Sequence, residues 1–194
     1  MTFQESKDKN TFDDKYGELE EMFGRPYREL QDYFKKVEPK GVVLDVGCGQ
    51  GRDALYLASL GYDVTALDTS KVGVEQMLEK AKQKNLSVKG IVGDARSTEI
   101  NGMYDIILFD MVLHGFEESE RLRMIEEYSK KLNKDGIICI VFPDDMKEED
   151  FIKLSESENS SWSLRDKVVI HDVPTVDGED VDYTFIMIVV QKTL

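Results

Sequence analysis

A short apolar run that leads into a glycine-rich turn constrains the fold of this chain more than any other feature. The run Val42 to Val46 is mostly β-branched, glycines follow at positions 47, 49 and 51, and a helical pattern begins directly after them. Glycine allows positive φ and close approach of a ligand to the backbone, and free N–H groups at the start of a helix favour an anionic group. The segment therefore predicts a buried strand, a tight turn and a helix that together hold a cofactor.

The spacing of the glycines argues against two common phosphate-binding turns. A dinucleotide fingerprint carries glycines at its first, third and sixth positions, and the sixth position counted from Gly47 is Arg52. A P-loop ends in Gly-Lys-Ser or Gly-Lys-Thr, whereas this turn ends in Gln50, Gly51 and Arg52. The turn therefore disfavours a nicotinamide-dependent oxidoreductase and does not match a P-loop.

Strand and helix patterns alternate along the chain. Strands are expected at residues 42–46, 63–67, 86–92, 104–109 and 136–142, and helices at 26–36, 53–60, 70–84 and 118–132. This alternation predicts an α/β fold with three layers and a mostly parallel sheet. A short acidic helix at 144–155 and a loop at 155–163 are expected next. Strand patterns at 167–173 and 183–191 then predict a C-terminal antiparallel hairpin, which makes seven strands. We expect one domain over residues 1–194, with residues 1–10 mobile and residues 11–40 as an N-terminal helical cap.

Composition and charge exclude several classes of protein. No apolar run is long enough to span a membrane, and the polar first ten residues lack the apolar core of a signal peptide. The two cysteines, Cys48 and Cys139, give no disulfide framework, and no His/Cys cluster has the spacing of a zinc site. The net charge of −14 repels phosphate backbones. We therefore expect a cytoplasmic protein, monomeric or homodimeric, with no membrane, nucleic-acid or metal partner.

Acidic residues are concentrated towards the C-terminus. Residues 144–182 contain 13 carboxylates and 4 basic side chains. The ordinary interpretation is a solvated surface that keeps the protein in solution. The alternative is a rim of a binding site that prefers a neutral or cationic small substrate.

An aspartate stands at or just beyond the end of four expected strands. Asp45 closes the first, Asp68 the second, Asp94 follows the third, and Asp110 follows the fourth. Ligands of open α/β sheets bind outside the carboxyl ends of the strands. Each aspartate alone could be a helix cap or a turn residue, but together they predict a polar site around the glycine turn.

The pattern Asp-x-Gly-x-Gly-x-Gly at residues 45–51 resembles motif I of the class I methyltransferases, which bind S-adenosylmethionine (SAM). The stretch from Gly47 to Asp68, the triplet at 15–17, and the pattern at 104–113 look like the TehB-like tellurite-resistance and thiopurine-type small-molecule methyltransferases. The resemblance covers most of the chain. It implies the Rossmann-like methyltransferase fold, SAM as cofactor with S-adenosylhomocysteine (SAH) as product, and a small-molecule or metalloid acceptor.

The resemblance also implies which residues hold the cofactor. Asp68 would hold the ribose, Asp94 the adenine amino group with the backbone of Ala95, and the glycine turn the methionine moiety, supported by Asp45. Asp110 and Met111 would line the methyl side. The full set of expected cofactor-binding residues is Asp45, Gly47, Cys48, Gly49, Gly51, Arg52, Asp68, Thr69, Asp94, Ala95, Asp110 and Met111.

Three residues are candidates for the acceptor side. His114 follows the fourth parallel strand, His171 lies in the hairpin, and Tyr16 could fold over the cofactor as part of a lid. The two histidines are the candidates for a catalytic base. In tellurite-type members a His-Arg pair precedes the last hairpin turn, but here Asp172 follows His171, which puts an oxyanion acceptor in doubt. A SAM- or nucleotide-binding sensor or partner subunit without transferase activity is the alternative function.

Overall fold

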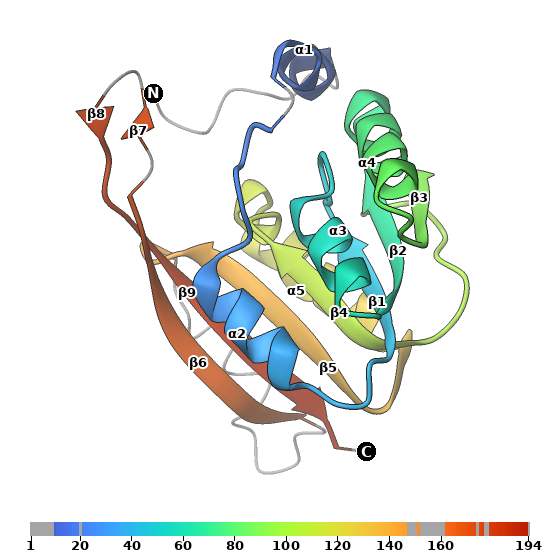
Figure 1. Ribbon diagram of the computed structural model, residues 1–194. Helices are drawn as coiled ribbons and strands as arrows, with labels where there is room; N and C mark the ends of the chain where they lie inside the picture. Colours follow the sequence, from blue (N-terminus) through green and yellow to red (C-terminus); the bar gives the residue numbers. More distant parts are fainter. Residues whose placement is uncertain are drawn as a thin grey trace.

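The computed structural model describes residues 10–19, 21–146, 151, 162–173, 175–176 and 179–193. Its helices are α1 (Asn10–Glu18), α2 (Arg28–Lys36), α3 (Arg52–Ser59), α4 (Lys71–Gln83), the 3-10 turn η1 (Leu113–Gly115) and α5 (Glu118–Ser129). Its strands are β1 (Val42–Val46), β2 (Asp63–Asp68), β3 (Val88–Val92), β4 (Tyr104–Asp110), β5 (Leu132–Pro143), β6 (Trp162–Asp172), β7 (Thr175–Val176), β8 (Glu179–Asp180) and β9 (Tyr183–Lys192). From β1 to β5 the elements follow the order that the sequence predicts (Figure 1).

A seven-stranded sheet with the order β3-β2-β1-β4-β5-β9-β6 organises the fold. The strands from β3 to β5 in this order are parallel, whereas β9 runs antiparallel to both β5 and β6. The strand order reverses between β1 and β4, and open α/β sheets bind ligands at such a reversal, outside the carboxyl ends of the strands. The predicted fold class, a mostly parallel seven-stranded sheet with a C-terminal antiparallel hairpin, is confirmed.

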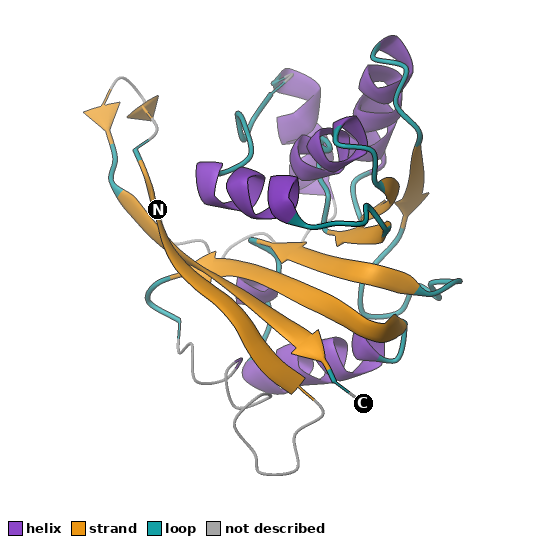
Figure 2. Ribbon diagram, turned by 60° about the horizontal axis from the view of Figure 1, so that its bottom comes forward, coloured by secondary structure: helices purple, strands orange, loops and turns teal. Residues whose placement is uncertain are grey.

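Apolar side chains pack on both faces of the sheet, between helices on either side (Figure 2). Helices α2, α3 and α4 cover one face, where Leu30, Ala54 and Met77 are buried. Helix α5 covers the other face with Met124 and Ile125. Burying one such large side chain contributes about 1.5–3 kcal/mol. The central strands are apolar almost throughout because they are covered on both sides.

Local contacts fix the ends of two helices. The Oγ of Ser70 accepts a hydrogen bond from the N–H of Gly73 at 3.0 Å, so Ser70 is the N-cap of α4. Gly61 follows α3 with φ +95°, a conformation that suits glycine at the C-terminal end of a helix. These caps place the carboxyl end of β2 directly beside the first turn of α4.

Two strands begin earlier than the sequence predicts. β6 starts at Trp162 instead of residue 167, because Trp162 pairs with Lys192 on β9. β5 starts at Leu132, where a helix was expected to end, because Leu132 pairs with Tyr104 on β4. In both places pairing with a distant strand overrides the local polar composition.

Some expected features lie outside the described residues. They include most of the acidic helix at 144–155, the loop at 155–163 up to residue 161, and residues 1–9. Helices α1 and α2 lie in the expected N-terminal cap. Within the described ranges, no helix is both long enough and apolar enough to cross a membrane.

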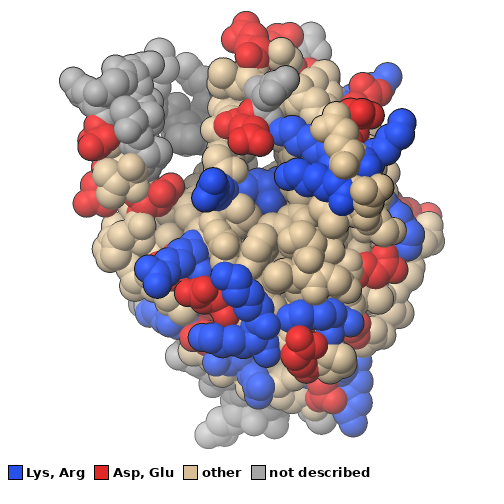
Figure 3. Space-filling view, viewed as in Figure 1, with Lys and Arg blue, Asp and Glu red and all other residues tan. Residues whose placement is uncertain are grey.

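Charge is unevenly distributed over the surface despite the net charge of −14. On the face shown in Figure 3, Lys and Arg side chains gather over α2 and around α4. Several of these side chains form exposed pairs with acids one helical turn away, such as Arg28 with Asp32 and Lys71 with Glu75. Exposed pairs of this kind contribute little to stability.

Candidate functional site

The turn between β1 and α3 has a left-handed backbone at all three of its glycines. The φ angles are +79° at Gly47, +51° at Gly49 and +80° at Gly51. Residues with a Cβ avoid this region. The N–H groups of Gly47 and Cys48 both donate to the carbonyl of Leu67 on β2, at 2.7 and 3.0 Å. The turn therefore depends on its glycines and is tied to the end of β2.

Neighbouring side chains approach this turn too closely for any larger residue. A Cβ on Gly47 would lie 2.2 Å from a methyl group of Val112, just after β4. A Cβ on Gly51 would lie 2.2 Å from the Cγ of Met77 on α4. Met111, between β4 and Val112, also has a left-handed backbone, with φ +54°. The turn thus forms a bare backbone cradle where β1, β2 and β4 end.

Asp68 holds this cradle from the end of β2. Its carboxylate accepts hydrogen bonds from the N–H of Gly49 at 2.8 Å and of Ser70 at 2.7 Å. Thr69 follows Asp68 in the chain, directly before Ser70. Burial raises the pKa of Asp68, although the backbone donors of Ser70 and Gly49 oppose the shift. A carboxylate has about four lone-pair sites, so acceptor capacity remains for a ligand hydroxyl.

Helix α1 covers the cradle. Tyr16 is only 4% exposed, and its hydroxyl would lie 2.6 Å from a Cβ on Gly49. Asp13 accepts hydrogen bonds from the Ser70 hydroxyl and from the N–H of Val72 at the start of α4. The side-chain amide of Gln76 donates to the carbonyl of Tyr16 at 2.7 Å. The structure therefore places Tyr16 against the glycine turn, at the cofactor side of the candidate site.

Three acidic side chains from different elements lie together under the N-terminus of α3. Asp45 is 2% exposed, Asp53 6% and Asp110 8%. Arg52 makes a 3.0 Å ion pair with Asp53 and a shorter one with Asp110. Sequence reasoning singled out Asp45, Arg52 and Asp110 but missed Asp53, because an acid in the first turn of a helix is common.

Burial and mutual repulsion dominate the electrostatics of this cluster. Burial raises the pKa of Asp45, and the carboxylates of Asp53 and Asp110 raise it further. Burial likewise raises the pKa of Asp110, and Asp53 adds to the shift, while Arg52 opposes it. For Arg52, burial lowers the pKa, but Asp53 and Asp110 outweigh that effect, so the guanidinium stays charged.

An aromatic wall adjoins the cluster, and only the helical spacing of Tyr27 pointed to any part of it. The Arg52 guanidinium lies 4.6 Å from the ring centre of Tyr27. Tyr27 contacts Phe185 at 5.2 Å between ring centres, and Phe185 stacks on Tyr183 at 6.0 Å. The wall therefore runs from the ion-paired Arg52 to the exposed start of β9.

Asp94 and Ala95 lie at the far end of the expected cofactor site, after β3. The Asp94 carboxylate pairs with Arg96 at 2.6 Å and accepts a hydrogen bond from its N–H at 2.9 Å. The Tyr128 hydroxyl donates to the carbonyl of Ala95 at 3.0 Å. Both contacts order the turn after β3 beside the carboxyl end of β2.

The two histidines occupy different environments. His114 lies in η1, half-buried; burial lowers its pKa, and Asp145 partly opposes the shift. His171 lies on β6 opposite Thr184 and is exposed. Because side chains alternate along a strand, His171 and Asp172 face opposite sides of β6. Of these two residues, Asp172 contributes to the raised pKa of Tyr27, after the larger effects of burial and of Asp110.

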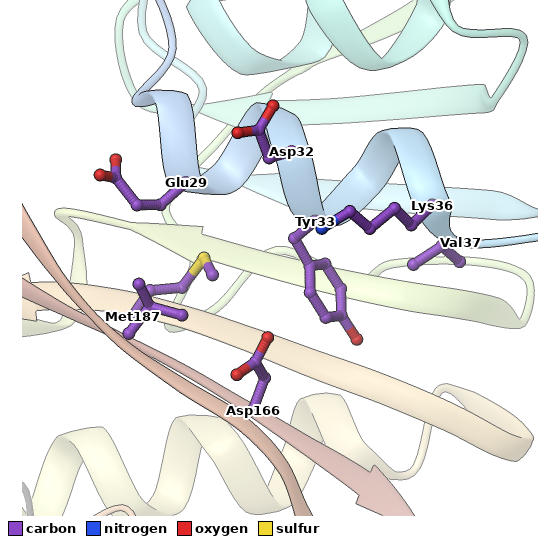
Figure 4. Close-up of a pocket in the computed structure, with 8 residues that line it drawn as sticks. Glu29, Asp32, Tyr33, Lys36, Val37, Asp166 and Met187 are labelled. Carbon is purple, nitrogen blue, oxygen red and sulfur yellow. The ribbon is translucent and has the colours of Figure 1, made fainter.

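A separate open cleft of about 390 Å3 lies between α2 and the C-terminal strands (Figure 4). Tyr33 and Lys36 border it on α2, and Asp166 and Met187 border it on β6 and β9. Asp166 pairs with Val189 on β9, and Val189 pairs with Cys139 on β5. Cys139 in turn pairs with a residue near the middle of β4. The cleft is therefore set back from the strand ends that carry the candidate site.

Comparison with known proteins identifies the family. The family profile described as "Tellurite resistance protein TehB" matches residues 4–153, which contain both the glycine cradle and the buried acidic cluster. The chain belongs to the TehB family. The resemblance predicted from the sequence is thereby confirmed.

Individual TehB-family relatives agree with this assignment. The "Probable S-adenosyl-L-methionine-dependent methyltransferase TehB" of Haemophilus influenzae is 30% identical over 132 residues, which cover 65% of this chain and 46% of that protein. This chain therefore spans about half the length of that curated relative.

Solved structures show the same fold. The crystal structure of TehB from Haemophilus influenzae matches 95% of this chain and 67% of that chain, with a TM-score of 0.71 and 22% identity. A structure from work on the conversion of a disulfide bond into a thioacetal group during echinomycin biosynthesis matches 95% of this chain and 91% of that chain, with a TM-score of 0.73 and 23% identity. The Rossmann-like methyltransferase fold implied by the resemblance is confirmed.

Proposed function

We propose that this TehB-family chain is a SAM-dependent methyltransferase that acts on a small-molecule or metalloid acceptor. The observation that carries the proposal is the glycine cradle, left-handed at Gly47, Gly49 and Gly51 and held by Asp68. It lies where the strand order reverses, the usual ligand site of an open α/β sheet. The Haemophilus influenzae relative, named as a probable SAM-dependent methyltransferase, supports the same activity.

The residues of the cradle fit the parts of this cofactor. Asp68 has acceptor capacity for the ribose, with Thr69 beside it. Asp94 and the backbone of Ala95 are proposed for the adenine. The turn with Cys48 and Arg52 is proposed for the methionine moiety. Oδ2 of Asp45 and Oδ1 of Asp110 are buried and accept no hydrogen bond from any donor in the described ranges, so positive groups of a ligand would suit them.

Methyl transfer needs alignment more than it needs a strong base. When bound against the glycine turn, SAM would supply an activated methyl group on a sulfonium and would leave as SAH. The chain's task is to hold the acceptor in line, which the enclosing residues Met111 and Tyr16 would support. Half-burial keeps His114 neutral, so it could take a proton from an acceptor that must lose one.

The charge of the acceptor side favours a neutral or cationic acceptor over an oxyanion. The Asp172 carboxylate is among the groups that raise the pKa of Tyr27. The Arg52 guanidinium beside that ring is already paired with Asp53 and Asp110. The cation that would meet an oxyanion is thus neutralised, and a carboxylate stands nearby. Thiols and amines are therefore the first acceptors to test.

Calorimetry and product detection test this function. Titration with SAM, SAH and NAD should show binding of the two adenosyl ligands and not of NAD. A panel of thiols, small amines, selenite and tellurite, incubated with protein and SAM, should then release SAH with at least one acceptor. Lack of binding by either adenosyl ligand would refute the proposal. Binding without SAH release across the panel would favour a non-catalytic SAM sensor or partner subunit.

A further inference from the structure

The buried acidic cluster under α3 carries more negative charge than its single cation balances. Asp45 on β1, Asp53 on α3 and Asp110 on β4 are each at least nine-tenths buried. Arg52 pairs with Asp53 and Asp110. Among the groups that act most strongly on Asp45 and Asp110, Arg52 is the only cation. Fully ionised, the cluster would hold two uncompensated negative charges, which is costly away from water.

Two oxygen atoms of this cluster have no hydrogen-bond donor among the described residues. Oδ2 of Asp45 and Oδ1 of Asp110 are inaccessible to solvent and accept no hydrogen bond from the described part of the chain. Nη2 of Arg52 contacts both Oδ2 of Asp53 and Oδ2 of Asp110, so these two carboxyl groups lie close together. Neighbouring carboxylates disfavour each other's ionisation, most strongly where burial removes the screening by water. The free protein therefore keeps a proton in the cluster at pH values where an exposed aspartate has lost it.

Groups on the neighbouring elements do not supply a second cation. Asp68 at the end of β2 adds negative charge near Asp45. Cys48 in the turn and Cys139 on β5 are thiols whose pKa is raised by burial. Tyr27, before α2, has its pKa raised by burial to about 12, and Asp172 on β6 adds to that shift. Among the described groups that act on the cluster, Arg52 is therefore the single cation.

Resting on the proposed function, we propose that Asp45, Asp53 and Asp110 form a charge selector that favours SAM over its product SAH by giving up a proton when a positively charged ligand binds. SAM carries a sulfonium charge that SAH lacks, whereas both carry the same amino group. Asp45 and Asp53 flank the two ends of the glycine turn proposed to hold the methionine moiety. Methyl transfer removes the sulfonium charge, which had taken the place of the proton in balancing the cluster. The product SAH is therefore released more readily.

Proton linkage gives this selector a definite pH dependence. Below the raised pKa of the cluster, SAM must displace a proton, and its advantage over SAH is small. As pH rises towards that pKa the displacement becomes easier, and the ratio of the SAH to the SAM dissociation constant increases. One additional released proton allows an increase of at most about tenfold per pH unit. Above the pKa the cluster is already ionised and the ratio becomes constant at its highest value.

Calorimetry in buffers of different ionisation enthalpy measures the released protons directly. We would titrate the full chain with SAM, with SAH and with an analogue in which a protonated amine replaces the sulfonium, in phosphate and in Tris between pH 6 and pH 9. SAM and the amine analogue should release more protons than SAH, by up to one. The sulfonium lowers the pKa of the amino group in SAM relative to SAH, so proton release with each ligand is compared between the unchanged chain and the cluster variants, and that difference reports the cluster.

Substitutions in the cluster then test whether the additional released proton comes from its carboxyl groups. Asp110→Asn should abolish the extra proton release and make the SAM/SAH ratio independent of pH, and Asp53→Asn should do the same if Asp110→Asn does not fold. Asp63→Asn removes an exposed carboxylate at the other end of β2, 3.6 Å from Lys89, and should leave both readouts unchanged. Equal proton release for SAM and SAH, with both bound, would overturn the selector alone. Failure of both to bind would overturn the proposed function with it.

Discussion

At the scale of single residues, Gly49 shows how a backbone angle links the cradle to its cover. Its φ of +51° places it in the left-handed region, and its N–H is bonded to Asp68. The Tyr16 hydroxyl occupies the space that a side chain at this position would need. Conformation, the hydrogen bond and packing therefore all require glycine here.

Gly49→Ala should lower the free energy of unfolding by about 1–2 kcal/mol, the cost of a left-handed non-glycine residue. It should also weaken SAM binding, because the Cβ would displace Tyr16. Gly17→Ala is the matched control: Gly17 lies in α1 with no atom within 4 Å of the added Cβ. Alanine is the better helix former, so stability should stay equal or rise slightly. Urea unfolding measures the free energy of unfolding of both variants. An equal loss of this free energy in the two variants would contradict this account.

At the scale of elements, α1 is a cover that depends on its neighbours for its position. It is a helix of 9 residues, too short to be stable alone in water. Gln76 on α4 joins it to the cradle, because its amide donates to Tyr16 and its Oε1 accepts from Gln50 at 2.8 Å. Gln50 also accepts from the N–H of Met22 at 2.9 Å. Side-chain amides therefore hold the cover together with the Asp13 carboxylate, which accepts hydrogen bonds from Ser70 and Val72.

Gln76→Ala should loosen α1 and leave the sheet intact. Losing these bonds costs about 1 kcal/mol, which corresponds to roughly fivefold faster amide exchange in α1. Dissociation of SAM should accelerate by a similar factor. Gln83→Ala, on the same helix, removes only an exposed bond to Glu79 and serves as the control. Unchanged exchange in α1 after Gln76→Ala would show that the Asp13 hydrogen bonds and the apolar contacts hold the cover without Gln76.

At the scale of the whole molecule, the net charge of −14 opposes compaction. Repulsion among like charges destabilises a folded protein, and salt reduces it by shortening the Debye length from about 30 Å at 0.01 M to about 8 Å at 0.15 M. Exposed ion pairs such as Arg28 with Asp32 weaken over the same range, but each contributes at most about 1 kcal/mol. Net repulsion should therefore dominate the response to salt.

The Tm should rise by a few degrees between 0.01 M and 0.15 M NaCl, because screening relieves this repulsion. Differential scanning calorimetry would measure the shift. KCl should give the same rise, since screening does not depend on which monovalent cation is present. A falling Tm, or a rise with only one of the two salts, would point to local ion pairs or to specific ion binding instead.

Much of the fold follows from local patterns. The β-branched run at β1, the glycine turn and the Ser70 cap predict the first half of the sheet closely, because each is a short-range signal. The start of β6 at Trp162 was missed, because its polar surroundings resemble a loop and only pairing with β9 makes it a strand. The aromatic wall was missed for the same reason, since Tyr27 and Phe185 are far apart in the chain.

The sequence by itself determined the order of the elements, the position of the glycine cradle and the resemblance to the TehB family. Only the tertiary structure brought Asp53 into the cluster with Asp45 and Asp110, and placed α1 over the turn. The reason is physical: glycines and strand ends act through local backbone geometry, which a sequence pattern records. The charge state of a buried carboxyl depends on desolvation and on neighbours from other strands and helices, which only the folded chain brings together.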